Sequence, residues 1–348
     1  MPEPTRAALA EFIQQAAADG VTAWPTWNRR LNHVRRLGAE LLRADVDEVA
    51  LIRNTTEGIS LVAEGFPWQP GDNVVTLADE FPSNVYPWLN LKSRGVETRR
   101  LATDGGAISL QALRDACDER TRIVTLSWVN YATGYRHDLN AIAELVHQQG
   151  ALLFVDAIQG LGVYPLDVRA TPIDFLAADG HKWMLGPEGA GLFYVRREHL
   201  DRLRAIGVGW HSVVHSQDFQ HIALDLKPAA SRYEGGSQTM IGMTGFGASL
   251  ELLLAYGADR IERRLLDYTD MACEQLQSIG AQVASHRDGT CRSGIVAFEL
   301  PGQDPATIRE RCLEAAVVVN VRGGRLRISP HAYNNEDDLD RLIAALAS

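Results

Sequence analysis

The sequence predicts an α/β fold with a mainly parallel sheet covered on both faces, followed by a smaller α+β unit. Between residues 48 and 195, short apolar runs typical of buried strands alternate with amphipathic patterns typical of helices. After a long helical pattern over about 240–282, strand patterns recur among shorter helices. The chain has 348 residues, of which 46% are hydrophobic, and this is enough for two domains with cores of their own.

The first domain is expected to begin with two helices, over about 4–18 and 24–43, where apolar residues recur at helical spacing. Six short segments are strand candidates, at 73–77, 97–101, 123–128, 152–156, 175–178 and 191–195. Four helical patterns lie among these strands, at 56–63, 83–94, 109–117 and 139–149. Residues 200–232 follow neither period and predict a long functional loop or lid.

The last third of the chain predicts the smaller α+β unit. Strand patterns cover 293–299, 317–321 and 325–328, and helical patterns cover 305–315 and 335–347. We place a large domain at 15–255 and a small C-terminal domain at 256–348, with residues 1–14 able to pack on the small one.

The composition of the chain indicates which partners to exclude and in which cellular compartment the protein is expected. The net charge of −10 argues against nucleic acid, because phosphate binding needs basic clusters. The chain has no run of about 18 apolar residues and no N-terminal signal pattern, so we expect no membrane span and a cytoplasmic location. Four cysteines without metal-ligand or paired spacing indicate reduced thiols: Cys117, Cys273, Cys291 and Cys312.

Lys182 is a candidate nucleophile. The chain has three lysines, and this one stands in GHKWMLGPEGAG, among apolar residues and glycines. Loss of hydration in such a stretch lowers the pKa of a lysine and frees its amine. The GPEGAG run lacks the spacing of a phosphate loop. A surface lysine in a turn is the other interpretation, since lysines are mostly exposed.

Asp156 ends an apolar strand, at the edge of the sheet where ligands bind in open α/β folds. It is either a cap of the following turn or the partner of a cationic ring nitrogen, whose charge a nearby carboxylate favours.

Two further segments predict anion binding. In RNTTEGI, Asn54 and Glu57 have the spacing of a helix cap, and Thr55 and Thr56 then stand where a helix start can bind a phosphate. An ordinary capped helix explains this segment equally well. Arg327, in an alternating strand pattern, is either a carboxylate ligand or a solvated arginine on the strand face.

Seven motifs in this order resemble the class V aminotransferase family of fold-type I pyridoxal-phosphate enzymes: TTEGI, DEFPSNVYPW, VDAIQG, GHKWMLGPEG, RYEGGS, RSGI and RISPHAYN. The similarity is greatest to the branch of cysteine desulfurases, selenocysteine lyases and isopenicillin-N-epimerase-like proteins. It implies a large, mainly parallel seven-stranded α/β domain, a small C-terminal α+β domain and a homodimer with shared active sites. It also implies chemistry at the α-carbon of an amino acid, as a transaminase or as a C–S lyase or epimerase.

The resemblance assigns a role to each motif residue. Lys182 would hold pyridoxal phosphate as a Schiff base and move protons at the α-carbon, and Asp156 would pair with the ring nitrogen. The other assignments are Phe81 stacking on the ring, Gln159 and Tyr131 at the ring oxygen, Thr55, Thr56 and His181 at the phosphate, Ser237 at the phosphate of the neighbouring subunit, and Arg327 at the substrate α-carboxylate.

Three departures from the family pattern concern the cofactor. Phe81 replaces a histidine of many desulfurases, so it can stack but cannot relay a proton. Asp179 replaces a phosphate-binding serine, and we expect its carboxylate to point elsewhere or its backbone N–H to bind. Tyr131 replaces an asparagine, and the neighbouring Asn130 is the other candidate for that position.

A fourth departure concerns sulfur chemistry. Desulfurases carry a nucleophilic cysteine just before the substrate arginine, but VVVNVRGGRLR has none. Cys312 fits a buried structural thiol and Cys291 lies in a polar turn. Cysteine desulfurase activity through a protein persulfide is therefore disfavoured, while β-elimination, which needs no thiol, stays open.

The start of the chain lies almost at the first helix, whereas family members begin with an extended segment that reaches the active site. Either the start codon is misassigned or part of the pocket is built differently, which keeps a non-catalytic pyridoxal-phosphate-binding protein as an alternative. His211, His215 and His221 lack the carboxylates of a metal site, so no metal is expected, and Trp210 and His211 are predicted at the pocket mouth.

Overall fold

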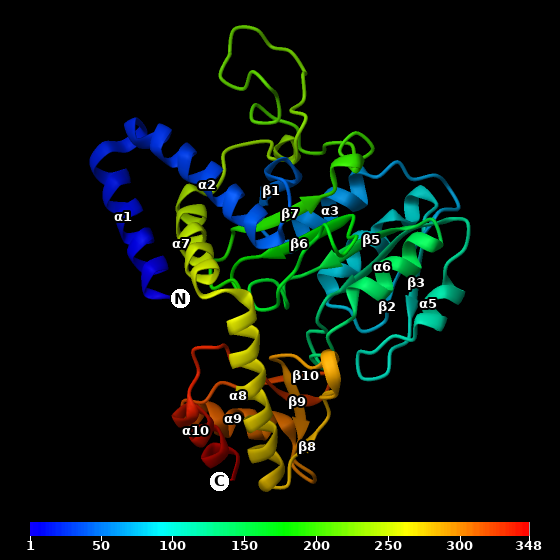
Figure 1. The fold of residues 1–348 in the computed structure, drawn as a ribbon, viewed down its shortest axis with the longest axis vertical. Helices are drawn as coiled ribbons and strands as arrows, with labels where there is room; N and C mark the ends of the chain where they lie inside the picture. The colour runs from blue at the N-terminus through cyan, green and yellow to red at the C-terminus, as the bar shows by residue number, and fades with distance from the viewer. Residues whose placement is uncertain (348) are drawn as a thin grey trace.

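A seven-stranded sheet forms the centre of the large domain in the computed structural model, which describes residues 1–347 (Figure 1). Its strands lie in the order β1, β7, β6, β5, β4, β2, β3. β7 runs antiparallel to both neighbours, and all other pairs are parallel, which confirms the predicted mainly parallel sheet. The strands are β1 (Val49–Ile52), β2 (Asn73–Leu77), β3 (Glu97–Leu101), β4 (Thr121–Ser127), β5 (Leu152–Asp156), β6 (Phe175–Asp179) and β7 (Gly191–Val195).

Helices cover both faces of this sheet because successive strand residues point to opposite sides. On β5, for example, Leu153 and Val155 belong to one buried cluster and Phe154 belongs to another. The first cluster joins the sheet to α2, α5, α6 and α7, and the second joins it to α3 and α4. These helices are α2 (Trp24–Leu42), α3 (Thr55–Gly65), α4 (Tyr86–Leu89), α5 (Leu110–Ala116), α6 (Leu139–Gln148) and α7 (Met240–Tyr256).

The small domain is a four-stranded antiparallel sheet with helices packed against it (Figure 1). The strand order is β10, β11, β9, β8, and a third buried cluster fills the space between sheet and helices. This confirms the expected α+β unit. Its elements are α8 (Ala258–Ser278), β8 (Gln282–Val283), β9 (Val296–Glu299), α9 (Pro305–Glu314), β10 (Asn320–Arg322), β11 (Arg325–Ile328) and α10 (Glu336–Ala347).

The N-terminal helix α1 (Glu3–Asp19) packs along α7 of the large domain. Met1 and Pro2, just before it, lie beside Arg260 and Tyr333 of the C-terminal third. The domain boundaries themselves stay a prediction.

Two local predictions were wrong, and one strand was missed. The helical pattern over 240–282 forms two helices, α7 and α8, which bend by 82° at Gly257, where φ is +82°. The pattern over 83–94 forms only the short α4 between two 3-10 turns, because Pro87 lacks the N–H that a continuing helix needs. β1 was not predicted, since four consecutive apolar residues show no period.

The 200–232 segment is the loop that the sequence predicts. It contains a 3-10 turn at Ala230–Tyr233 and an isolated bridge between Val213 and Leu226. Figure 1 shows part of it projecting from the large domain, at the end remote from the small domain. Within residues 1–347, no single helix has the length and apolar character needed to cross a membrane, and the α7–α8 pair meets that test only together, across its bend.

Candidate active site

Lys182 lies in a tight turn directly after β6, at the carboxyl end of the sheet. The turn is closed by hydrogen bonds from Leu185 N to Lys182 O at 3.0 Å and from Gly186 N to Gly180 O at 2.8 Å. Burial lowers the pKa of the Lys182 ammonium group, and the nearby Asp156 carboxylate opposes this shift. The lowered pKa increases the share of neutral amine, as a nucleophilic lysine requires.

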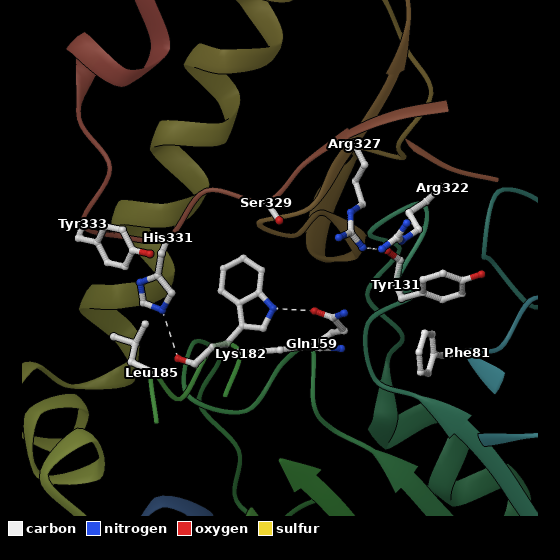
Figure 2. A pocket seen from close by; sticks show the side chains of 11 residues that line it. Phe81, Tyr131, Gln159, Lys182, Leu185, Arg322, Arg327, Ser329, His331 and Tyr333 are labelled. Carbon is white, nitrogen blue, oxygen red and sulfur yellow. Dashed lines mark hydrogen bonds between the residues drawn. The ribbon is translucent and has the colours of Figure 1, made fainter. Parts of the chain in front are cut away.

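A cavity of about 370 Å³ surrounds Lys182 between the two domains (Figure 2). It brings together five of the predicted residues: Phe81, Tyr131, Gln159, Lys182 and Arg327. The remaining lining residues were not singled out as site residues from the sequence: Trp183, Leu185, Arg322, Ser329, His331 and Tyr333.

Asp156 ends β5 near Lys182 and is 2% exposed. Burial raises the pKa of its carboxyl to about 6, against the lowering effects of a hydrogen bond from Ile158 N (3.1 Å) and of the Lys182 charge. A carboxylate so poorly solvated is stabilised by a cation placed against it. The ring nitrogen of pyridoxal phosphate is such a cation, so this position fits the predicted partner.

Phe81 is suited to pack against the face of an aromatic cofactor ring, and Gln159 is suited to bind an oxygen at its edge. The Nζ atom of Lys182 lies 5.5 Å from the centre of the Phe81 ring, so the phenyl group faces the space beside the amine. The Oε1 atom of Gln159 accepts a hydrogen bond from Trp183 Nε1 at 2.8 Å. This bond orients the amide so that its NH₂ group can donate to a ring oxygen.

The start of α3 is the segment where the sequence predicts a phosphate. The side chain of Asn54 caps the helix by accepting a hydrogen bond from Glu57 N at 2.9 Å. The first N–H groups of a helix have no partner within it and attract anions. Thr56 donates its hydroxyl to Ser83 at 2.9 Å, which adds Ser83 to this position.

Asp179 is directed away from a phosphate by two contacts. Its backbone N–H donates to the Thr55 hydroxyl at 2.9 Å, so Thr55 ties α3 to the end of β6. Its carboxylate pairs with His181, with 3.0 Å between Oδ2 and Nδ1. The other carboxylate oxygen is buried and has no hydrogen-bond partner within residues 1–347. This pairing fixes the orientation of the His181 ring.

Arg327 projects from β11 of the small domain into the cavity (Figure 2). Its guanidinium donates a hydrogen bond to the carbonyl oxygen of Tyr131. Its Nε atom is buried without a partner among the described residues, and burial lowers the pKa of the side chain. A guanidinium that lines the cavity and keeps one N–H without a partner fits the predicted role of binding a substrate carboxylate.

Tyr131 and Asn130, the other residues predicted near the ring oxygen, are oriented differently from Gln159. The Tyr131 ring meets Phe81 edge to face at 5.3 Å, and its hydroxyl points away from Lys182 and Gln159 in Figure 2. The other candidate, Asn130, accepts hydrogen bonds from Ala132 N and Thr133 N through its side chain. Asn130 therefore stabilises the turn that carries Tyr131.

Ser237 is exposed and lies outside the Lys182 cavity, in a hollow that Thr56 and Glu57 also line. Its predicted contact with the phosphate of a neighbouring subunit stays a prediction. Trp210 and His211, expected at the pocket mouth, do not line the cavity in this chain, and His211 lies instead beside Arg35 and Lys227.

His331 connects the small domain to the Lys182 turn. Its Nδ1 atom accepts a hydrogen bond from Ala332 N at 2.9 Å, so the proton of the neutral ring is on Nε2, which lies 3.2 Å from Trp183 O. Burial lowers the pKa of this imidazole. Its motif, RISPHAYN, was recognised in the sequence, but nothing there indicated this contact across the domains.

No cysteine lines the Lys182 cavity. Cys312 is fully buried in α9, and the Cys291 thiol lies 2.8 Å from Asp288 O in a turn. Burial raises the pKa of the Cys312 thiol and makes its thiolate scarce.

A histidine–carboxylate cluster lies at the opposite end of β6. The two oxygens of Asp174 are each 2.7 Å from a ring nitrogen, one of His147 and one of His199. Asp174, His199 and Glu198 together have a spacing that could hold a metal ion. Both oxygens of Asp174 are already engaged, and the carboxylate also accepts a hydrogen bond from Leu153 N, so we interpret the cluster as structural.

Comparison with known proteins gives matches along nearly the whole chain. A family model described as aminotransferase class V matches residues 6–342. The probable cysteine desulfurase of Methanothermobacter thermautotrophicus is 31% identical, covering 98% of this chain and 90% of that protein. The cysteine desulfurase of Shigella sonnei is 30% identical, covering 91% of this chain and 82% of that protein.

Solved structures share the fold. The cystine C–S lyase C-DES in complex with cysteine persulfide has a TM-score of 0.94 at 21% identity, covering 100% of this chain and 94% of that one. The apo cysteine desulfurase of Thermococcus onnurineus has a TM-score of 0.90 at 23% identity, covering 100% and 91%.

Proposed function

This chain belongs to the class V aminotransferase family, and from that premise we propose that it is a C–S lyase acting on cysteine-type amino acids. It is a pyridoxal-phosphate-dependent enzyme. The cofactor fits the site: Asp156 for the ring nitrogen, Phe81 and Gln159 for the ring, and the α3 start with His181 for the phosphate.

The chain's own residues divide the work of the reaction. When bound, pyridoxal phosphate supplies an aldehyde that captures an amino group and a cationic ring that withdraws electrons from the α-carbon. Lys182 holds the cofactor and, once the substrate has displaced its amine, takes the α-proton. Arg327 binds the α-carboxylate and so fixes which bond of the α-carbon faces Lys182.

The absence of a thiol from the Lys182 cavity is the observation that favours β-elimination over the desulfurase mechanism. Relatives named as cysteine desulfurases support a cysteine-type substrate. No side chain lining the Lys182 cavity can accept sulfur as a persulfide, which disfavours the desulfurase mechanism. In β-elimination the Cβ–S bond breaks, the electron pair leaves with sulfur, and the remaining three-carbon unit is hydrolysed to pyruvate and ammonia. This reaction needs no protein thiol.

The test is product analysis of the holoenzyme. We expect pyruvate, ammonia and a sulfur-containing product from L-cysteine or L-cystine, and none from the Lys182→Ala variant. Transfer of an amino group to 2-oxoglutarate, or α-proton exchange with inversion, would replace this proposal by transamination or epimerisation. No spectral change with any amino acid would indicate a non-catalytic cofactor-binding protein. Sulfide release that depends on Cys312 would show that a thiol takes part.

We also propose that the enzyme is a cytoplasmic homodimer with shared active sites. The family resemblance supports the dimer, together with the exposed position of Ser237 after a projecting loop. Four cysteines without disulfides support a reducing compartment. Sedimentation analysis and subcellular fractionation test these two statements, and a monomer or a secreted protein would contradict them.

A further inference from the structure

Glu80 is a buried carboxyl group near the cofactor site that has no cation beside it. It is 7% exposed and forms no salt bridge within residues 1–347. Its Oε1 atom accepts a hydrogen bond from Ser127 N at 2.7 Å. Its Oε2 atom accepts hydrogen bonds from Ser127 Oγ at 2.5 Å and from Asn84 Nδ2 at 3.2 Å. A buried carboxyl group without a cation costs stability, and such groups are frequent at functional sites.

Glu80 begins the turn that carries Phe81. The Phe81 ring lines the cavity, and its centre lies 5.5 Å from Lys182 Nζ (Figure 2). The far end of the turn is bonded to β4 as well, because Asn84 Oδ1 accepts a hydrogen bond from Thr125 Oγ1 at 2.7 Å. Glu80 and Asn84 therefore fasten both ends of this turn to β4, with Phe81 between them.

The same strand brings Glu80 close to Asp156. Ser127, which donates to Glu80, is the register partner of Asp156 on β5, and the next residue, Trp128, donates its N–H to Asp156 O at 2.9 Å. Burial, and after it the charge of Asp156, raises the pKa of Glu80 to about 7. A cation placed against Asp156 reduces this repulsion between the carboxyl groups, so it favours an ionised Glu80.

Three other titratable groups lie around this pair. Asp79 precedes Glu80 in the chain, and its Oδ2 atom accepts a hydrogen bond from an asparagine amide at 3.0 Å. His137 is bonded to the end of β4, and burial lowers the pKa of its imidazole, so the ring is neutral at pH 7 and above. The Lys182 charge acts on Asp156. Among the carboxyl and imidazole groups here, Glu80 is the one expected to ionise around pH 7.

We propose that Glu80 is a positioning residue of the cofactor site, which holds Phe81 against the cofactor ring and, when ionised, adds its negative charge to that of Asp156 behind the ring nitrogen. Glu80 acts through these two neighbours, since it does not itself line the Lys182 cavity. This role concerns how the cofactor is held and does not depend on which reaction follows at the α-carbon.

The charge is tested by fluorescence titration of the apoenzyme with pyridoxal phosphate at several pH values. Glu80→Gln keeps an oxygen for Ser127 N but cannot ionise. If the bound cation lowers the pKa of Glu80 by about one unit, the ratio of dissociation constants, Glu80→Gln over wild type, rises about tenfold between about pH 6 and pH 8.5.

Glu48→Gln is the matched control for this titration. Glu48 is also buried, and its carboxylate accepts the backbone N–H groups of Asp45 and Arg197, away from the cavity. The ratio of its dissociation constant to that of wild type should stay constant with pH. A constant ratio for Glu80→Gln, or an equal rise for Glu48→Gln, would overturn the role of the Glu80 charge.

The hold on Phe81 is tested by a double-mutant cycle, with the same titration at pH 6. Glu80→Ala removes the hydrogen bonds to β4, and Phe81→Leu removes the aromatic ring. If Glu80 acts through Phe81, the two losses of affinity overlap, and the double variant binds the cofactor almost as well as Phe81→Leu alone. Additive losses would overturn this role. Should Glu80→Ala fail to fold, Glu80→Asp, which shortens the side chain by one methylene, takes its place.

Discussion

At the scale of single residues, two carboxyl groups near the cavity, Asp156 and Glu80, have pKa values that burial raises. Asp156 and Glu80 approach each other through Ser127, which is the β-sheet partner of Asp156 and donates its backbone N–H to Glu80 at 2.7 Å. Burial raises the pKa of Asp156 to about 6 and that of Glu80 to about 7. The two carboxyl groups have different proposed roles, because only Asp156 has a proposed ligand.

Asp156 makes cofactor binding depend on pH. Its folded pKa, without cofactor, is raised to about 6, so the carboxylate that favours a cationic ring is present above this pH and is lost below it. We expect the cofactor affinity of the apoenzyme to rise between about pH 5 and 7, and to rise less in Asp156→Asn. Fluorescence titration at several pH values measures this, and parallel profiles for the two proteins would refute the assignment.

Glu80 makes stability depend on pH in the opposite sense to a salt-bridged acid. Its raised pKa means that its contribution to the free energy of unfolding is full below its ordinary 4.5 and is lost as the pH rises to about 7. The change is on the order of 3 kcal/mol. Glu80→Gln cannot ionise, so its stability should fall less over this range. Urea unfolding of both proteins at pH 5 and pH 7 is the check, and equal changes would contradict it.

At the scale of elements, the sequence predicted those whose pattern is local. The strands 73–77, 97–101, 152–156 and 191–195 match the structure to the residue. Three of them, β2, β5 and β7, are buried and mostly apolar runs bounded by turns, which is a local pattern typical of a core strand. The bend at Gly257 was missed because both helices keep a helical pattern up to it. The glycine itself was the available signal, because a glycine with positive φ is a common helix C-cap.

Asp174 ties three elements together, and its removal should be costly. Asp174 lies directly before β6. Its carboxylate accepts hydrogen bonds from His147 of α6 and from His199, which follows β7. We expect Asp174→Asn to lower the free energy of unfolding by about 2–3 kcal/mol, against little change for the exposed Asp47→Asn. Chemical denaturation at neutral pH measures both, and similar values for the two variants would contradict the structural role.

The same carboxylate makes the free energy of unfolding depend on pH in acid. Hydrogen bonds from His147 and His199 hold the pKa of Asp174 at about 2, despite its burial. Because the folded pKa lies below the ordinary 3.8, the stabilisation is full above that value and is lost as the pH falls toward 2. The stability gap between wild type and Asp174→Asn should therefore narrow below about pH 4, and a gap that stays constant in acid would contradict this mechanism.

At the scale of the whole molecule, the cavity exists only where the two domains meet. Lys182, Phe81 and Gln159 come from the large domain, and Arg327 and His331 come from the small one. The residues of the large domain could be predicted because each follows the end of a strand by three or four residues, within a recognisable motif. Arg322 and the contact of His331 with Trp183 could not, because they depend on how the hairpin of the small domain is placed over the Lys182 turn.

The central claim is that Lys182, and no other amine of this chain, holds the cofactor. The most direct measurement is reduction of the holoenzyme with borohydride, followed by digestion and mass spectrometry of the peptides that contain the three lysines, Lys92, Lys182 and Lys227. We predict that the reduced cofactor is attached to the Lys182 peptide alone and that Lys182→Ala carries none. Attachment at Lys92 or Lys227, or a wild-type protein without covalent cofactor, would contradict the account.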